Sequence, residues 1–208
     1  MCTETFLRLP EEKRTRFLDA AWEEFTQTGF ADASINQIVR RAGVPRGSFY
    51  QYFSGKDDLF DYLGNIILKH LIDEYRDIMK RCDGDIFRTQ MCCFERVATY
   101  GRAADLLFER SIRIVQKNPG LLPQTVMREQ VLRKIFASVR DDMDVSRLRE
   151  QADAFVEHTF GLTLITLAIA VVSCLEAPEQ APAIREALAM QLNIIERGSL
   201  AESGRGTL

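Results

Sequence analysis

The sequence predicts an all-α protein of about nine helices, with a helix-turn-helix near the N-terminus and a larger helical region after it. Apolar residues recur at helical spacing along nearly all of the 208 residues, and no segment alternates as a strand does. A glycine turn, "AGV" at 42–44, joins two short helical stretches, which is the helix-turn-helix arrangement. With 46% hydrophobic and 27% charged residues, the composition is typical of a soluble globular protein with a packed core.

Three helices are expected in the N-terminal part, at about 10–28, 34–42 and 45–53. Gly29 is expected to end the first helix, because glycine is favoured just beyond a helix C-terminus. The second is expected to start at Ser34, where "SINQ" has the Ser-x-x-Gln pattern of a capping box. Pro45 suits the first helical position of the third helix.

Further helices are expected at about 54–80, 85–101, 103–117, 124–141, 146–175 and 180–197. Ser54 and Asp57 are predicted to form a second capping box at the start of the first of these. The uncharged run from His158 to Leu175 approaches the length of a membrane span. Because three threonines and a serine interrupt it, the run predicts a buried helix. The expected domains are residues 1–55 and 56–208.

The charge is small overall and uneven along the chain. A net charge of −3 argues against an indiscriminate binder of nucleic acid or anionic membranes. Between Ala33 and Lys56 there is no acid, so that Arg40, Arg41, Arg46 and Lys56 are expected to be unopposed. A local basic patch on an acidic protein predicts binding of a polyanion at one place.

The third helix has two different faces. Phe49 and Phe53 lie one turn apart and are expected to pack in the core of a three-helix unit, against the aromatic residues of the first helix. The remaining surface, with Gly47, Ser48 and Tyr50, is small and polar and can lie close to another molecule. Lys56 is expected in the first turn of the next helix, where free amides and an ammonium favour phosphate.

Several classes of function are excluded by missing motifs. There is no HExxH, glycine-rich phosphate loop or Gly-x-Ser-x-Gly, and the only histidines are His70 and His158. We therefore expect no enzyme, metal or cofactor. No secretory signal is visible, and five cysteines without zinc spacing fit a reducing cytoplasm. The cysteines are interpreted as small buried hydrophobes, with a redox role for Cys92 and Cys93 left open.

The segment "TGFADASINQIVRRAGVPRGSFYQYFSGKDDLF" at 28–60 resembles the DNA-binding domain of the TetR family of bacterial transcriptional regulators. The matching residues are Gly29-Phe30, Ile38, Ala42-Gly43-Val44, Gly47, Phe49-Tyr50-x-Tyr52-Phe53, Lys56 and Leu59-Phe60. The resemblance implies a homodimer that places two recognition helices in successive major grooves of a palindrome-like operator in double-stranded DNA. Phe49 departs from the leucine that the family often has.

The resemblance also assigns roles residue by residue. The implied DNA-binding residues are Ser34, Arg46, Gly47, Ser48, Tyr50, Tyr52 and Lys56. Of these, Arg46 and Tyr50 would face base edges, and Ser48, Tyr52 and Lys56 would hold phosphate. Gly47 would allow close approach, and Ser34 would cap the second helix near the DNA backbone. Arginine is the usual bidentate partner of guanine, which agrees with the role of Arg46.

In the second domain the resemblance implies an effector pocket and a dimer interface. The helices at 146–175 and 180–197 would pair with their copies, with Gly161 and Ala168 on a face suited to close helix approach. Candidate effector-binding residues are the apolar Phe87, Met91, Phe94, Phe108 and Ile112 and the polar His158, Thr159 and Thr163, each of which has a core role as its alternative. The expected function is a repressor released by a small, largely apolar effector. The alternative is a constitutive DNA-binding or partner-binding protein of the same fold.

Overall fold

The structure is a computed structural model that describes residues 2–100, 105–118 and 120–201. These residues form eleven α-helices, two short 3-10 helices and no strand, so the all-α fold class is confirmed. The chain divides into two compact units. The first is Met1–His70 with Asp105–Asn118, and the second consists of the described residues within Leu71–Ala104 and Pro119–Leu208. Each unit is described by itself, and the expected domain boundary after residue 55 stays a prediction.

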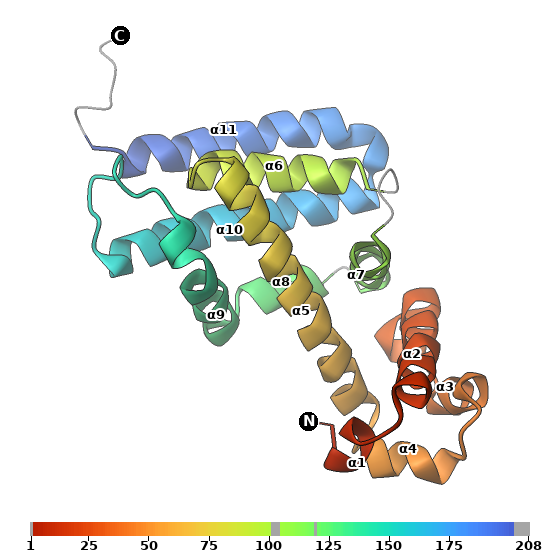
Figure 1. The fold of residues 1–208 in the computed structure, drawn as a ribbon. Helices are drawn as coiled ribbons and strands as arrows, with labels where there is room; N and C mark the ends of the chain where they lie inside the picture. The colour runs from red at the N-terminus through yellow and green to blue at the C-terminus, as the bar shows by residue number, and fades with distance from the viewer. Residues whose placement is uncertain (1, 101–104, 119, 202–208) are drawn as a thin grey trace. The chain divides into compact units, whose positions relative to one another are not determined.

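The first unit holds the expected helix-turn-helix. Its helices are α1 (Glu4–Leu7), α2 (Glu11–Asp32), α3 (Ile35–Ala42), α4 (Arg46–Tyr52), the first part of α5 (Lys56–Arg81) and α7 (Leu106–Lys117) (Figure 1). Helix α2 packs on both α3 and α7, and α4 packs on α1 and α3.

Helix α2 breaks at Gly29, as the sequence predicts, but the chain then makes a further turn to Asp32. Gly29 has φ 78° and ψ 175°, a backbone conformation that favours glycine. A Cβ at this position would lie 3.1 Å from the carbonyl oxygen of Lys117. The next amide, of Phe30, donates to Asn118 Oδ1 at 3.1 Å. The glycine is therefore needed both for its φ and for the close approach of α7.

The turn between α3 and α4 has the predicted geometry. Gly43 is left-handed, with φ 65° and ψ 35°. Its amide donates to the Arg40 carbonyl at 3.2 Å, and the Val44 amide donates to the Val39 carbonyl at 3.0 Å. These bonds satisfy carbonyls that the end of α3 would otherwise leave free. Pro45 is the N-cap of α4 and not its first helical residue, a difference of one position.

An aromatic cluster forms the core of this unit. The side chains of Phe49, Phe53 and Phe17 are almost completely buried, which confirms the predicted inner face of α4. Helix α1 was not predicted, yet its Phe6 is fully buried and lies 4.8 Å from Phe53 and 5.7 Å from Tyr52 between ring centroids. The segment before α2 therefore belongs to the core of the helix-turn-helix unit.

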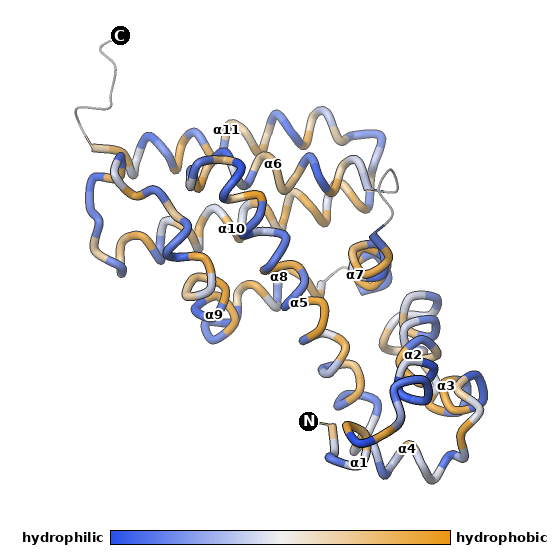
Figure 2. The backbone as a smooth tube through the Cα atoms, in the orientation of Figure 1, coloured by the Kyte–Doolittle hydropathy of each residue, from blue (hydrophilic) through white to orange (hydrophobic). Residues whose placement is uncertain are grey.

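The second unit is a bundle around α10. It contains the rest of α5, α6 (Ile86–Ala98), α8 (Leu121–Val126), α9 (Glu129–Val139), α10 (Asp153–Glu176) and α11 (Ala181–Ser199). Helices α6, α10 and α11 pack on one another, and α8 and α9 pack on α10 (Figure 1). Figure 2 shows hydrophobic residues along much of α10 and a mixed pattern along α11. By length and composition α10 could cross a membrane, but 61% of its most apolar stretch is buried, as in a core helix.

The expected start of the long helix at 146 is wrong, because α10 begins at Asp153. Tertiary hydrogen bonds hold the preceding segment outside the helix. The Asp144 amide donates to the Gly84 carbonyl at 2.9 Å, and the Arg149 amide donates to the Ser199 carbonyl at 2.9 Å. Leu148 pairs with Leu200 in an isolated bridge. The helical spacing of Leu148 from the residues that follow it suggested a helix. The hydrogen-bond partners that prevent it lie far away in the sequence and could not be seen there.

The other differences concern helix number and one face of α10. The stretch expected as a single helix at 124–141 is divided between α8 and α9, which together with α1 raises the count from nine to eleven. The expected break near Gly101 lies outside the described residues. Gly161 and Ala168 are buried inside the unit, and a Cβ on Gly161 would lie 3.0 Å from Leu132 Cδ2. The expectation that these two residues face a partner chain is therefore wrong.

Candidate nucleic-acid interface

Helix α4 has one face in the core and one in solvent. Phe49 has none of its surface exposed, whereas the adjacent Tyr50 is 51% exposed. Arg46 and Gly47 are exposed as well, and Ser48 is partly exposed. Adding a Cβ to Gly47 would meet no atom within 4 Å inside the chain. The exposed face thus offers a guanidinium, a phenol and a hydroxyl around a residue with no side chain.

Tyr52 belongs to the core more than expected. Its ring is buried and lies edge-on to Phe17, with 5.6 Å between centroids. Its carbonyl oxygen accepts the amide of Thr3 at 3.0 Å, and the Thr3 hydroxyl donates to the Gln51 carbonyl at 2.6 Å. The N-terminal segment therefore caps the end of α4. The predicted phosphate contact of Tyr52 stays a prediction and concerns only its hydroxyl.

The start of α3 is held by a carboxylate that the sequence pattern did not indicate. Ser34 is the N-cap residue, but its side chain makes no capping bond, and Gln37 Oε1 is buried without a partner among the described residues. The predicted Ser34–Gln37 capping box is therefore wrong. Glu24 of α2, which is 3% exposed, accepts the Ser34 amide at 2.8 Å. It satisfies the amide that Gln37 would have satisfied in a capping box.

Glu24 also changes the charge of the predicted basic patch. Its second carboxylate oxygen lies 2.7 Å from Arg41 Nη1, and the Arg41 side chain is 30% exposed. Arg41 is therefore paired, and the expectation that it is unopposed is wrong. Arg40 and Arg46 are exposed and have no ion-pair partner in the part of the chain that the structure describes. These two guanidinium groups are therefore available to bind a polyanion.

Lys56 is the first residue of α5, as expected, and it binds the end of α2. Its Nζ donates to the carbonyl oxygens of Ala31 at 3.0 Å and Ala33 at 3.2 Å, and lies 4.8 Å from the Phe30 ring centroid. An ammonium has three donors. Lys56 therefore orders the α2–α3 connection, and its predicted phosphate contact stays a prediction.

The second predicted capping box has a different partner. The amide and hydroxyl of Ser54 both donate to Asp58 Oδ2 at 3.0 Å, and not to Asp57. Because α5 begins at Lys56, the carboxylate still lies in its first turn, where it is favourable. The expected acid is therefore displaced by one position.

The candidate effector residues fall in both units. Phe108 and Ile112 are buried on α7 in the first unit, while the other six lie on α6 and α10 in the second. His158 is exposed, with Nδ1 2.6 Å from the Ala154 carbonyl oxygen. Thr163 accepts a hydrogen bond from Gln90 Nε2 at 2.9 Å. Gln90 Oε1 and the Tyr75 hydroxyl are buried without a hydrogen bond of good geometry among the described residues. Burial raises the pKa of Tyr75, and a weak side-chain hydrogen bond from Gln90 opposes this shift.

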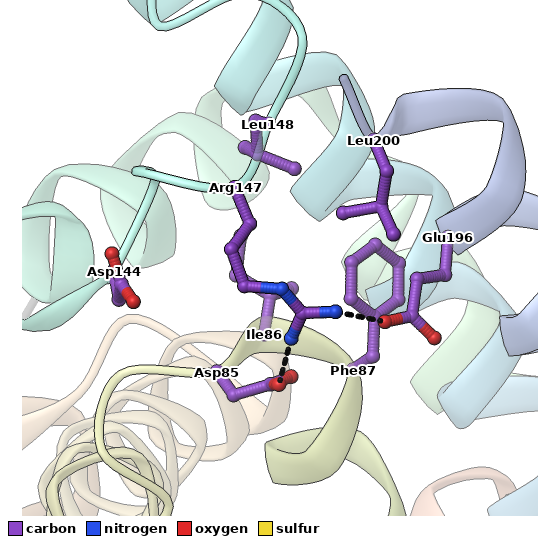
Figure 3. Close-up of a pocket in the computed structure, with 8 residues that line it drawn as sticks. All are labelled: Asp85, Ile86, Phe87, Asp144, Arg147, Leu148, Glu196 and Leu200. Atoms are coloured by element: carbon purple, nitrogen blue, oxygen red, sulfur yellow. Dashed lines mark hydrogen bonds and ion pairs between the residues drawn. The ribbon is translucent and has the colours of Figure 1, made fainter. Parts of the chain in front are cut away.

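Two described pockets lie in the second unit. The smaller has a volume of about 30 Å³, and Arg147 crosses it to reach Asp85 and Glu196 at 3.4 Å each (Figure 3). That volume suits one or two water molecules and no larger ligand. Phe87 is the only predicted effector residue that lines it. The larger pocket, of about 320 Å³, is lined by Ile78, Arg81, Cys82, Arg88, Cys92, Glu95, Arg96 and Thr99. None of these was predicted.

The N-terminal unit carries the sequence likeness to known proteins. A family model described as "Bacterial regulatory proteins, tetR family" matches residues 17–63. The HTH-type transcriptional regulator SrpR of Pseudomonas putida is 52% identical over 46 residues, which are 22% of each chain. The chain matches only about a fifth to a third of the length of the curated relatives that come first. The helix-turn-helix unit therefore matches the TetR family of bacterial regulatory proteins.

Solved structures extend the likeness of fold to most of the chain. A transcriptional regulator from Rhodococcus sp. Rha1 has a TM-score of 0.62 and 18% identity, and the match covers 89% of this chain and 96% of that one. SmeT, the repressor of the Stenotrophomonas maltophilia multidrug efflux pump SmeDEF, has a TM-score of 0.55 and 18% identity. The match covers 97% of this chain and 96% of that one. SmeT in complex with triclosan has a TM-score of 0.52 and 16% identity, and the match covers 92% of this chain and 93% of that one. At these identities the likeness establishes a shared fold.

Proposed function

We propose that this chain is a cytoplasmic, DNA-binding transcriptional regulator that reads its operator with the exposed face of α4. The observation that carries the proposal is the division of α4, with Phe49 in the core and Arg46 and Tyr50 exposed. A rigid helix that presents arginine and tyrosine from an acid-free segment is suited to base edges in the major groove. The curated relatives matched by this segment are named transcriptional regulators, which supports the same function.

The regulator acts as a homodimer through α10 and α11. More than half of the surface is exposed for Leu162 and Ile169 on α10 and for Met190 and Ile194 on α11. Leu162 and Ile169 are seven residues apart and share a face, and so do Met190 and Ile194, four apart. Single exposed apolar residues are ordinary, but four of them on two helices that pack on each other support an interface at these helices. A two-fold dimer would present two α4 helices to two half-sites about 34–36 Å apart.

Effector release of a repressor is the finer part of the proposal. The buried oxygens of Tyr75 on α5 and Gln90 on α6 make only a weak hydrogen-bond contact between these two side chains, and Gln90 also bonds Thr163 on α10. Poorly paired buried polar atoms are costly, and a bound ligand with its own polar group would relieve that cost. A mainly apolar effector with one such group is favoured. SmeT, named as a repressor and solved with triclosan, supports the same type of regulation.

Fluorescence anisotropy of the purified chain tests the proposal. We expect nanomolar binding to DNA from upstream of its own gene, and weaker, strongly salt-dependent binding to a scrambled duplex of equal length. Equal affinity for the two duplexes at every salt concentration would contradict specific recognition at this site. Absence of binding even at low salt would favour the alternative, a partner-binding protein of the same fold.

A further inference from the structure

Two cysteine sulfurs meet in the second unit at a place the sequence did not indicate. Cys82 Sγ lies 3.5 Å from Cys92 Sγ. Cys82 follows directly after α5, and Cys92 lies on α6, so that the contact closes the short connection between these helices. A disulfide has an S–S distance of about 2.05 Å. The sulfurs must therefore approach by about 1.5 Å for a disulfide to form.

The same sulfur pair lines the larger pocket. Cys82 itself is almost completely buried, while Cys92 is partly exposed. The guanidinium-bearing residues Arg81, Arg88 and Arg96 line the pocket with them. Glu95 lines the pocket too, and Arg88 and Arg96 are paired with Asp83 and Glu74, so that the lining is polar and of mixed charge. The arrangement gives a small solute access to one thiol, with a second thiol in contact behind it.

The adjacent pair Cys92 and Cys93, whose redox role the sequence left open, does not have this geometry. Successive residues of a helix point about 100° apart, so that the two sulfurs diverge. Burial raises the pKa of the Cys93 thiol far above its usual value, with the neighbouring Cys92 adding to the effect. Cys82 is the partner that the fold supplies for Cys92.

We propose that Cys82 and Cys92 are a modification site at which a small peroxide produces an intramolecular disulfide. The Cys92 thiolate attacks one oxygen of the peroxide, breaking the O–O bond and giving a sulfenic acid and an alcohol or water. Cys82 then attacks the Cys92 sulfur and displaces water, which completes the disulfide. In total, two thiols lose two protons and two electrons, and the peroxide takes up both.

The site adds an oxidant signal to the proposed regulator, and this link to DNA binding rests on the proposed function. Helix α5 runs without interruption from Lys56 to Arg81, and Cys82 is the next residue. A bridge would pull the end of α5 towards α6. We expect operator affinity to change at least about fivefold, the lower end of typical coupling between sites. Reduction of the disulfide would restore the original affinity.

Peptide mapping of the full chain tests the modification directly. The reduced protein is treated with one to two equivalents of hydrogen peroxide, the remaining thiols are alkylated, and the digest is analysed by mass spectrometry. We expect a peptide pair joined through Cys82 and Cys92, and free thiols at the other three cysteines. Cys92→Ser should abolish the product, whereas the matched variant Cys174→Ser, in buried α10, should leave it unchanged. Because the unmodified chain gives the main result, the test does not depend on the folding of a variant.

The possible outcomes distinguish failure of the proposed disulfide site from failure of the proposed regulatory function. A link between other cysteines, a link between chains, or a sulfinic acid at Cys92 without a bridge would overturn the site. A Cys82–Cys92 bridge that leaves specific operator affinity unchanged would overturn the sensing role. If the reduced protein shows no specific operator binding at all, the proposed function fails, and the peptide map still decides the modification site.

Discussion

At the residue scale, neighbouring side chains on α4 have opposite surroundings. Phe49 packs in the aromatic cluster, 6.2 Å from both Phe17 and Phe53 between ring centroids. Tyr50 touches the edge of Phe49 at 5.3 Å but has half of its surface in solvent. In the proposed function, stability and recognition are therefore carried by different residues of one short helix.

This division predicts different effects for two matched aromatic truncations. Phe49→Ala should lower the free energy of unfolding by about 3–5 kcal/mol, because it leaves a cavity in a closed core. Tyr50→Ala should change it by less than about 1 kcal/mol and weaken specific DNA binding. Urea unfolding followed by circular dichroism measures the first effect. Equal stability losses for the two variants would contradict the assignment of the two faces.

Glu24 makes two tertiary contacts in the helix-turn-helix unit. It is buried, accepts the Ser34 amide and pairs with Arg41. Glu24→Ala should lower the free energy of unfolding by about 2–3 kcal/mol, below the 3–5 typical of a broken buried pair, because Arg41 keeps access to water. Thermal unfolding measures this. The control is Glu23→Ala, an exposed neighbour 3.8 Å from Arg41 Nε. A control loss as large as that of Glu24→Ala would refute the role given to burial.

At the scale of elements, Lys56 joins the start of α5 to the end of α2. Lys56→Met keeps the apolar stem and removes the charge, so it should leave the carbonyls of Ala31 and Ala33 without that donor. A stability loss of about 1 kcal/mol is expected. If the ammonium also contacts phosphate, affinity for all DNA sequences should fall alike, and the slope of log K against log salt should decrease by about one. Anisotropy titrations at several salt concentrations measure the slope, and an unchanged slope would assign Lys56 to structure alone.

Short sequence patterns predicted those parts of the fold that depend on neighbouring residues alone. Gly43 and the aromatic spacing of α4 were enough for the turn and the buried face. Helix α1 is four residues long and has no repeat, so periodicity could not show it. The break between α8 and α9 has no glycine or proline at 127–128. For α1, the fully buried Phe6 shows that tertiary packing holds the helix in place.

The candidate sites also divide into those formed within one short sequence motif and those formed by residues distant in the sequence. The residues proposed to face DNA lie within one local motif. The exposed position of Tyr50 followed from helical geometry, and that of Arg46 from the family resemblance. The Glu24–Arg41 pair spans 17 positions and the Cys82–Cys92 contact spans ten. No spacing rule indicates such pairs, because their members lie on different helices. They become visible only when the helices are packed.

At the scale of the whole molecule, the account requires two chains. Met190→Glu on α11 should convert the dimer to a monomer, because it places a charge in an apolar interface. Met127→Glu, at the residue that follows α8, is the matched control, since both methionines are 67% exposed. Light scattering coupled to size exclusion gives the mass of each variant. A dimer that persists in Met190→Glu, or is lost in Met127→Glu, would place the interface elsewhere.

The central claim is that α4 reads base sequence through its exposed face, and Arg46 tests it most directly. Specific and scrambled duplexes are titrated with the wild-type chain and with Arg46→Ala in the same anisotropy assay, after circular dichroism has shown an intact fold. We predict a loss of about 1–3 kcal/mol on the specific duplex and a much smaller change on the scrambled one. Undiminished specific affinity in Arg46→Ala would contradict the account.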